Sequence, residues 1–334
     1  ILYLSLVRRL YLQAYLLYFS YLILKVILMD NMDKISLVLA TYNGEKYLRE
    51  QLQSILDSVD AEKIIGEIII TDDGSSDGTE ALVHTFMEKN PLISFHKNPN
   101  KGVVNNFING IKLTKYGYVM FCDQDDYWVK TKISVSYNTI REMEKTRGRE
   151  TPALAFTDSK VVDVNLNIIN ESFFKYIGAD IENGLSLNKL MVNNVAQGCV
   201  MIVNRALIDA VDFSTSPHWV MHDWWMILIA SMHKNICAIK EPLLLYRQHD
   251  NNVFGAKRNT LIKKFTNLGK TYLQYKKSAF KIMKQNVAFR KSYPQSSAIV
   301  NDFSSGWYIK NESSVKRKIF ALLCIREVMD GINR

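Results

Sequence analysis

The chain has 334 residues, enough for one large domain with an appendage or for two domains. Its 48% hydrophobic and 22% charged residues exclude an intrinsically disordered protein, and its fifteen glycines and six prolines exclude a collagen-like one. The formal net charge of +9 is concentrated near the C-terminal end, since residues 255–334 carry seventeen Lys and Arg against four Asp and Glu.

Residues 1–31 form an apolar segment rich in Tyr, Leu and Ile. Polar residues interrupt the segment, so it is marginal as a membrane span, which needs about 20 apolar residues. Arg8 and Arg9 would place the domain that follows outside a bacterial cell. We interpret the segment as an extension upstream of a start at Met29 or Met32, with an amphipathic membrane-associated helix as the alternative.

Strands and helices are expected to alternate through the next hundred residues. The expected order is strand 35–40, helix 45–56, strand 67–71, helix 81–88, strand 93–96, helix 105–113 and strand 118–122. This alternation predicts an α/β fold with a doubly wound, mostly parallel sheet flanked by helices. Ligands bind such sheets at the carboxyl ends of the strands, so the polar groups found there should meet in one crevice.

Polar clusters follow three of these strands, at residues 41–43, 72–77 and 123–126. In the last cluster, Asp123, Asp125 and Asp126 come directly after a buried strand. Three carboxylates so close together repel one another, which requires a cation nearby. Carboxylate oxygens suit Mg²⁺ or Mn²⁺. The cluster therefore predicts a metal site that holds a diphosphate.

Glycine-rich nucleotide fingerprints are absent from the sequence. Neither GxGxxG after the first strand nor GxxxxGK[ST] occurs, which disfavours a dinucleotide dehydrogenase and a P-loop NTPase. The four cysteines, Cys122, Cys199, Cys237 and Cys324, are widely spaced and form no CxxC pair. They predict neither a disulfide framework nor a zinc site, and we interpret them as reduced, buried cysteines of a cytosolic protein.

The second half of the chain is expected to continue the fold and to end in helices. The expected elements are strand 153–156, helix 187–194, strand 198–203, helix 204–211, helix 221–232, a strand within 236–246 and Lys-rich helices in 256–334. The basic C-terminal region could bind anionic lipid, nucleic acid or a phosphate-bearing acceptor, and a solvated helical surface is the simpler alternative. No nucleic-acid recognition motif accompanies it, so we expect no nucleic acid to bind.

Several motifs, in this order and spacing over residues 33–255, resemble those of the family 2 glycosyltransferases, which have the GT-A fold. They are Thr41-Tyr-Asn with Glu45, the TDDGSSDGT run from Thr71 to Thr79, Asn100-Lys-Gly102, Asp123-Gln-Asp-Asp126 and His222-Asp223. The runs DQDDYW, HDWW and YRQHDNN are also similar to those of bacterial rhamnosyltransferase-type enzymes of capsule or cell-wall polysaccharide synthesis.

The resemblance implies a donor site and a metal site. The implied nucleotide- and donor-binding residues are Thr41, Tyr42, Glu45, Asp72, Asp73, Asn100, Asp126 and Arg247. Asp73 would accept a hydrogen bond from the nucleotide base, and Asp72 would assist or hold the loop. Asp123 and Asp125, at the DxD positions, would hold Mg²⁺ or Mn²⁺ with His249.

The resemblance also implies that Asp223 is the general base of an inverting transfer without a covalent intermediate. A helix N-terminus favours the ionised form of such a carboxylate, although capping that helix is the simpler alternative. Asp126 could share the metal, orient the donor sugar or cap a helix. Arg247 and His249 could close over the phosphates.

These residues together imply a function and a domain organisation. We expect transfer of a single sugar from dTDP-rhamnose or a UDP-sugar to a polysaccharide or lipid-linked acceptor. A non-catalytic nucleotide- or carbohydrate-binding scaffold of a polysaccharide assembly complex is the alternative, and the intact Asp223 favours the enzyme. We expect residues 32–255 to form the GT-A domain and residues 256–334 a basic helical region. That region would attach the cytoplasmic protein to the inner face of the plasma membrane.

Overall fold

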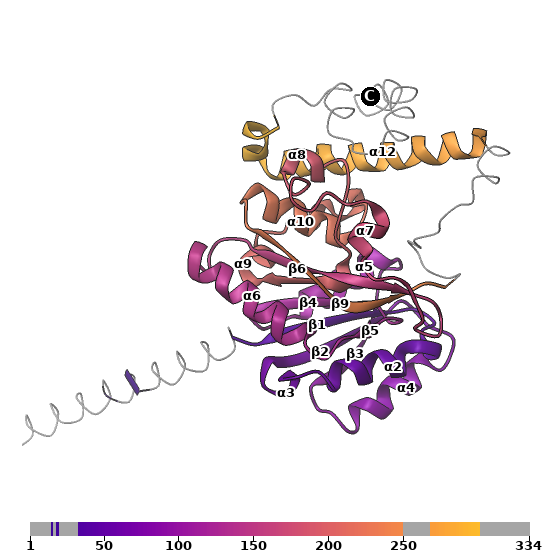
Figure 1. Ribbon diagram of the computed structural model, residues 1–334. Helices are drawn as coiled ribbons and strands as arrows, with labels where there is room; N and C mark the ends of the chain where they lie inside the picture. Colours follow the sequence, from indigo (N-terminus) through magenta and orange to yellow (C-terminus); the bar gives the residue numbers. More distant parts are fainter. Residues whose placement is uncertain (1–14, 16–17, 20–32, 250–267, 301–334) are drawn as a thin grey trace, which may run out of the picture.

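A computed structural model describes residues 33–249 and 268–300, together with Tyr15, Tyr18 and Phe19 (Figure 1). The expectations for residues 1–31 and for most of the region beyond residue 249 therefore lie outside the described residues. Within the described part of the chain, no helix is both long enough and apolar enough to cross a membrane.

Four parallel strands form the first half of the sheet, in the order β3-β2-β1-β4. The strands are β1 (Ile35–Thr41), β2 (Ile65–Asp72), β3 (Ile93–Lys97) and β4 (Tyr118–Cys122), connected through helices α2 (Glu45–Leu56), α3 (Ala61–Ile64), α4 (Thr79–Met87) and α5 (Val103–Leu113). Every residue of β1 and β4 is buried, as expected for apolar strands covered on both faces. The predicted doubly wound arrangement is confirmed here.

The second half of the sheet is mixed and continues in the order β4-β8-β6-β9-β5. Its strands are β5 (Tyr127–Trp128), β6 (Leu154–Val162), β7 (Ile168–Asn170), β8 (Met201–Asn204) and β9 (Ile236–Arg247). Strand β8 runs antiparallel to both β4 and β6, whereas β9 is parallel to β6. Strand β5, immediately after the acidic cluster, pairs with β9 and so brings Arg247 beside that cluster.

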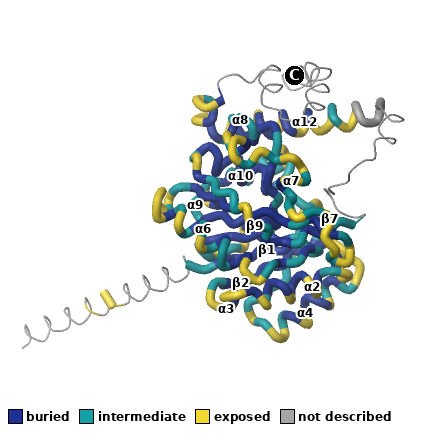
Figure 2. Tube along the Cα trace, viewed as in Figure 1, coloured by how far each residue is buried: buried dark blue, intermediate teal, exposed yellow. Residues whose placement is uncertain are grey.

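Helices and short 3₁₀ segments cover the mixed half of the sheet. They are α6 (Lys132–Arg147), α7 (Phe173–Ile177), α8 (Leu187–Leu190), η1 (Gly198–Val200), α9 (Arg205–Asp209), η2 (Phe213–His218), α10 (His222–Met232), α12 (Leu268–Ser292) and η3 (Pro294–Ala298). All of α10 is buried, because apolar residues surround this helix on every side (Figure 2). Helix α12 lies across the end of the molecule next to α8 and α10 (Figure 1).

Several predictions for this half are wrong. The helix expected over 187–194 ends at Leu190, and residues 198–200 of the expected strand form the 3₁₀ segment η1. Strand β6 continues to Val162 instead of ending near residue 156, because its polar residue Asp158 is buried and accepts hydrogen bonds from Ser172 Oγ and Phe174 N. These partners are distant in sequence, so the pattern suggests an exposed loop. Asp126 does not cap a helix, because α6 begins only at Lys132.

Candidate active site

The ends of β1 and β2 are joined by side chains that hold the loop after β2. Thr41 Oγ1 donates to Asp72 Oδ1 at 2.7 Å. The other carboxylate oxygen of Asp72 accepts from the backbone N–H groups of Gly74 and Ser75 at 3.0 and 2.7 Å. Thr41 and Asp72 are almost fully buried, so the loop-holding alternative for Asp72 matches its contacts.

Asp73 turns away from Asp72 and meets the loop that follows β3. Its carboxylate accepts from Asn98 Nδ2 at 2.9 Å and from Gly102 N at 2.9 Å. Gly102 has φ of +109°, a conformation that favours glycine. Asn100 belongs to the same turn, where its backbone contacts the side chain of Asn98. Asp73 and Asn100, both predicted to bind the nucleotide, therefore both contact the side chain of Asn98.

Glu45 joins the start of α2 to the start of α4. Its Oε2 accepts from Gly78 N at 2.9 Å, and its own backbone N–H donates to Asp77 Oδ2 at 3.1 Å. Asp77 also accepts from Thr79 N at 3.1 Å and so shapes the turn before α4, whose N-cap residue is Gly78. Glu45 thus links the loop after β1 to the loop after β2, and its predicted contact with the donor stays a prediction.

Gln124, which the sequence did not single out, links the first loop to the acidic cluster. Its Oε1 accepts from Tyr42 N at 2.8 Å and its Nε2 donates to Tyr42 O at 3.1 Å. The backbone of Tyr42 is held in this way while its ring is 56% exposed. An exposed ring held at the carboxyl end of β1 could pack against a bound nucleotide.

The acidic cluster at the end of β4 brings Asp123 and Asp126 together with Cys199. One ligand atom of each residue lies within 4.8 Å of those of the other two. Asp126 is fully buried, and although its Oδ1 accepts from Arg247 N at 3.0 Å, its Oδ2 has no partner in the described structure. Cys199 could not be predicted from its sequence neighbourhood, because the fold alone brings it here.

Burial and repulsion act together on these carboxyl groups. Burial raises the pKa of Asp123 to about 7, and the charges of Asp125 and Asp223 add to the effect. Burial also raises the pKa of Asp126 well above its usual value, again with a contribution from Asp125. Buried carboxylates that repel one another bind a cation readily, because the cation offsets their charge. Mg²⁺ and Mn²⁺ fit the carboxylates, whereas the Cys199 thiol is a soft ligand that suits these ions less well.

A buried lysine lies on the protein side of this cluster. Lys132 is fully buried, and its Nζ lies 4.2 Å from the centroid of the Trp128 ring. Burial lowers the pKa of Lys132 to about 8, opposed by Cys199, Cys122 and Asp126. Its positive charge therefore partly offsets the acidic cluster from within the protein, and no sequence motif marks this lysine.

Asp125 pairs with His249 rather than joining this group. Their Oδ2 and Nε2 atoms lie 2.8 Å apart, and the His249 ring stacks on Tyr47 with centroids 5.2 Å apart. The structure thus brings His249 to the acidic loop, as expected. It groups Asp126 and Cys199 with Asp123, however, so the predicted set of Asp123, Asp125 and His249 as metal ligands stays a prediction.

Arg247 donates to protein oxygens of three separate segments, and its predicted contact with phosphate stays a prediction. Its Nε donates to Asp125 O at 2.8 Å, its Nη1 donates to Val164 O at 2.6 Å, and its Nη2 pairs with Glu50. The guanidinium group also lies 4.6 Å from the centroid of the Tyr47 ring. Because every guanidinium nitrogen donates to a protein oxygen, the side chain holds the acidic loop in place.

Asp223 lies in the first turn of α10 and is only 8% exposed. Asn194 Nδ2 donates to its Oδ1 at 3.3 Å. Burial raises the pKa of Asp223 to about 7, while hydrogen bonds from the backbone of Trp224 and Gly198 lower it. Its charge in turn raises the pKa of Asp123, so the expected base lies beside the acidic cluster.

The aromatic residues around α10 belong to the core. The His222 ring stacks on Phe107 with centroids 3.8 Å apart, and burial lowers the pKa of His222 to about 3, so this side chain is neutral. Trp224 Nε1 donates to Leu190 O, and Trp225 stacks on the buried Trp219. These rings position the helix.

Replacing Gly198 by Ala is expected to lower kcat by about 10²-fold, because displacing a base by about 1 Å has an effect of that size. A Cβ at this position would lie 2.7 Å from His222 Nε2 and 3.5 Å from Asp223 Cβ. Steady-state kinetics measures the loss, and urea unfolding is expected to show about 1–3 kcal/mol of destabilisation. Wild-type kcat in G198A would contradict the tight contact.

Comparisons with known proteins agree with this geometry. Residues 36–146 match the family described as "Glycosyl transferase family 2". The chain therefore carries a glycosyltransferase family 2 domain. It is 29% identical over 231 residues to the dTDP-rhamnosyl transferase RfbG of Shigella flexneri, a match that covers 65% of the chain and 74% of that relative.

Two staphylococcal proteins extend the comparison of this glycosyltransferase. The poly-β-1,6-N-acetyl-D-glucosamine synthase of Staphylococcus aureus is 38% identical over 96 residues, which are 29% of the chain but only 23% of the synthase. The crystal structure of S. aureus TarS 1–349 in complex with UDP-GlcNAc superposes with a TM-score of 0.51 at 14% identity, covering 88% of the chain and 80% of TarS 1–349. This likeness shows the GT-A fold.

Proposed function

We propose that this glycosyltransferase moves a single sugar, with inversion, from dTDP-rhamnose or a UDP-sugar to a hydroxyl group of a polysaccharide or lipid-linked acceptor. The observation that carries the proposal is the position of Asp223 next to the acidic cluster. A Cβ on Gly198 would lie 3.5 Å from Asp223 Cβ, and the next residue, Cys199, lies with Asp123 and Asp126. The names of the relatives support the donor class, since one is a dTDP-rhamnosyl transferase and TarS was solved with UDP-GlcNAc.

The nucleotide would lie at the ends of β1 and β2. Asp73, held by Asn98 and Gly102, would accept a hydrogen bond from the base. The exposed Tyr42 ring offers a surface beside it. Thr41 and Asp72 would contribute indirectly, because their side chains hold the loop between these groups.

Asp123 and Asp126, with Asp125 and His249 beside them, would hold Mg²⁺ or Mn²⁺. When bound, the ion offsets the negative charge of the departing nucleoside diphosphate. The contacts of Arg247 support metal dependence, because its guanidinium group is already engaged by protein oxygens. That leaves the acidic loop in need of a cation if it is to accommodate a diphosphate.

Asp223 would act as the general base. Its carboxylate would take the proton of the acceptor hydroxyl while that oxygen bonds to the anomeric carbon. The bond between the anomeric carbon and the diphosphate oxygen breaks on the opposite face, so the configuration inverts. A base with a pKa near the working pH is efficient, and burial gives Asp223 that property.

The activity should depend on pH through this carboxylate. Burial raises the pKa of Asp223 to about 7, and a base works only when ionised, so kcat/KM should fall as the pH drops through that region and level off above it. A cation held by Asp123 would move the midpoint lower, because positive charge favours the neighbouring anion. A kcat/KM profile of the wild type that is flat between about pH 5 and 8 would contradict the assignment.

A panel of nucleotide sugars with Mn²⁺ tests the proposal. Wild-type protein should be stabilised against heating by one donor and should release its nucleoside diphosphate, faster with an acceptor present. Binding without release, across a broad panel of donors and acceptors, would favour the non-catalytic scaffold. Absence of both binding and release would reject the proposed reaction.

A further inference from the structure

The outer face of α12 carries a continuous stripe of lysines and exposed apolar side chains. The helix contains seven Lys and Arg residues and neither Asp nor Glu. Six exposed residues fall on one helical face, and we call them the α12 stripe: Leu273, Lys277, Lys281, Lys284, Val287 and Lys291. Leu273 and Val287 are 55% and 42% exposed. Both apolar side chains therefore lie in solvent among the lysines of this face.

The opposite face of α12 is anchored to the catalytic domain. Met283 and Phe289 are fully buried, and the Phe289 ring meets that of Trp225 in α10 at 5.3 Å between centroids. Two buried amides add directional contacts. Gln285 Oε1 accepts from Val220 N and Asn286 Nδ2 donates to Met191 O, both at 2.7 Å. The orientation of the stripe is therefore fixed relative to α10.

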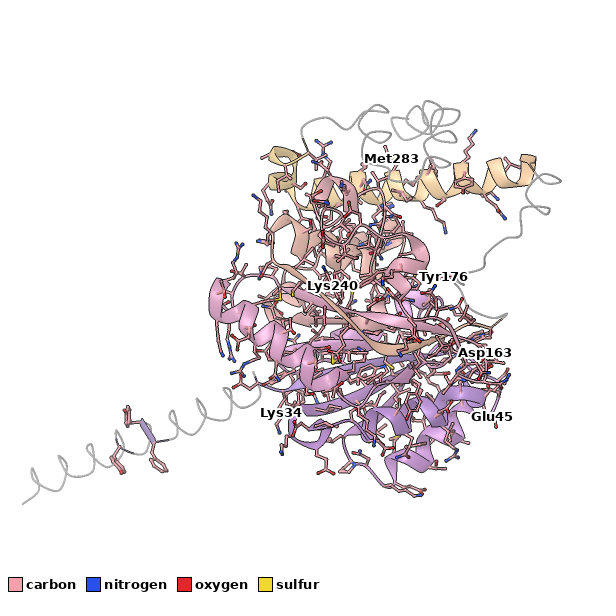
Figure 3. All side chains as sticks on the ribbon, viewed as in Figure 1. Lys34, Glu45, Asp163, Tyr176, Lys240 and Met283 are labelled. Carbon is pink, nitrogen blue, oxygen red and sulfur yellow. The ribbon has the colours of Figure 1, made fainter. Side chains whose placement is uncertain are left out.

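These anchors lie on the two segments that hold the proposed base. Val220 is three residues before Asp223, and Met191 is three residues before Asn194, its hydrogen-bond partner. The donor loops lie elsewhere, since Glu45 and Met283 are at opposite ends of the molecule (Figure 3). The α12 stripe is thus on the acceptor side of the site.

We propose that the α12 stripe docks on an anionic lipid bilayer and thereby turns the Asp223 side of the site toward an acceptor carried by a lipid. Lysines are attracted to anionic headgroups, and Leu273 and Val287 can enter the interface between them. Surfaces that bind single-stranded nucleic acid instead present exposed aromatic rings. The α12 stripe by itself supports docking on the bilayer. The inference that a lipid carries the acceptor rests on the proposed transfer reaction.

Sedimentation of the full chain with vesicles tests the docking. Vesicles of phosphatidylcholine and phosphatidylglycerol should bind the wild type in a salt-sensitive manner, and pure phosphatidylcholine should bind it much less. K277Q/K281Q/K284Q should bind the anionic vesicles at least about tenfold more weakly. The matched control is K63Q/K115Q/K145Q, which removes the same charge from exposed lysines elsewhere and should bind like the wild type.

Equal vesicle binding by the wild type and the α12 variant, or an equal loss in the control, would overturn the docking. Tighter binding of a single-stranded RNA than of anionic vesicles would overturn it in favour of nucleic acid. Donor hydrolysis in solution should be the same in both variants, so it reports separately on the proposed function. With an acceptor lipid in anionic vesicles, only the α12 variant should lose transfer, and unchanged transfer would overturn the lipid-borne acceptor.

Discussion

Asp223→Asn is expected to lower kcat by about 10²- to 10⁴-fold, the usual range for loss of a general base. The amide keeps the size of the side chain and can still contact Asn194, but it cannot take a proton. Donor affinity should change little, because the residues proposed to bind the nucleotide lie in the loops after β1 and β2. The measurement is steady-state transfer, with donor binding followed by calorimetry.

Two further readouts separate a base from a helix cap at this position. Asp57→Asn changes an exposed carboxylate at the end of α2 and should leave kcat unaltered. If Asp223 only caps α10, its Asn variant should lose stability but keep kcat, since Asn caps helices as well as Asp does. Near-normal kcat in a folded D223N protein would therefore remove Asp223 from the mechanism.

Asp125→Ala is expected to lower donor turnover by about 10²- to 10³-fold or more, as with loss of other groups that stabilise transition-state charge. The change removes a carboxylate from the acidic loop together with the hydrogen bond between Asp125 and His249. Turnover should be compared with and without Mn²⁺ in both proteins. The Mn²⁺ affinity of the resting protein, measured by calorimetry, should fall in parallel.

The same comparison distinguishes the two arrangements of ligands. If Asp123 and Asp126 hold the ion without Asp125, then D125A should retain Mn²⁺ binding while D123N should lose it. Equal turnover in the wild type and D125A, with the same response to Mn²⁺, would reject the assignment of Asp125. The exposed-carboxylate variant D57N is again the control, since it removes one negative charge outside the site.

The sequence was sufficient for the parallel half of the fold and for the location of the site. Apolar runs of strand length followed by polar turn residues mark β1, β2 and β4 clearly, and parallel strands bring their carboxyl ends to one edge. The convergence of Asp73 with the acidic loop follows from that rule. Asp223 required the family resemblance, because nothing local distinguishes it from a helix cap.

Contacts between segments distant in sequence could not be predicted. Cys199 and Lys132 reach the acidic cluster only through η1 and the start of α6, and neither has a local signature. Arg247 was expected at the phosphates because an Arg near a diphosphate usually binds it. In the structure, the Arg247 side chain also donates to Val164 O, on a turn that the sequence did not place near the site. A polar residue that is buried against a partner looks like an exposed residue in the sequence, so the pattern of apolar residues does not reveal it.

The proposed reaction requires that the acidic loop and the nucleotide-binding loops form a single site for a metal-bound nucleoside diphosphate. Calorimetric titration of UDP and dTDP, with and without saturating Mn²⁺, measures this coupling directly. Mn²⁺ is expected to tighten the binding of UDP or dTDP by about tenfold or more in the wild type, but not in D123N. Equal affinity with and without the ion, or coupling that survives in D123N, would contradict it.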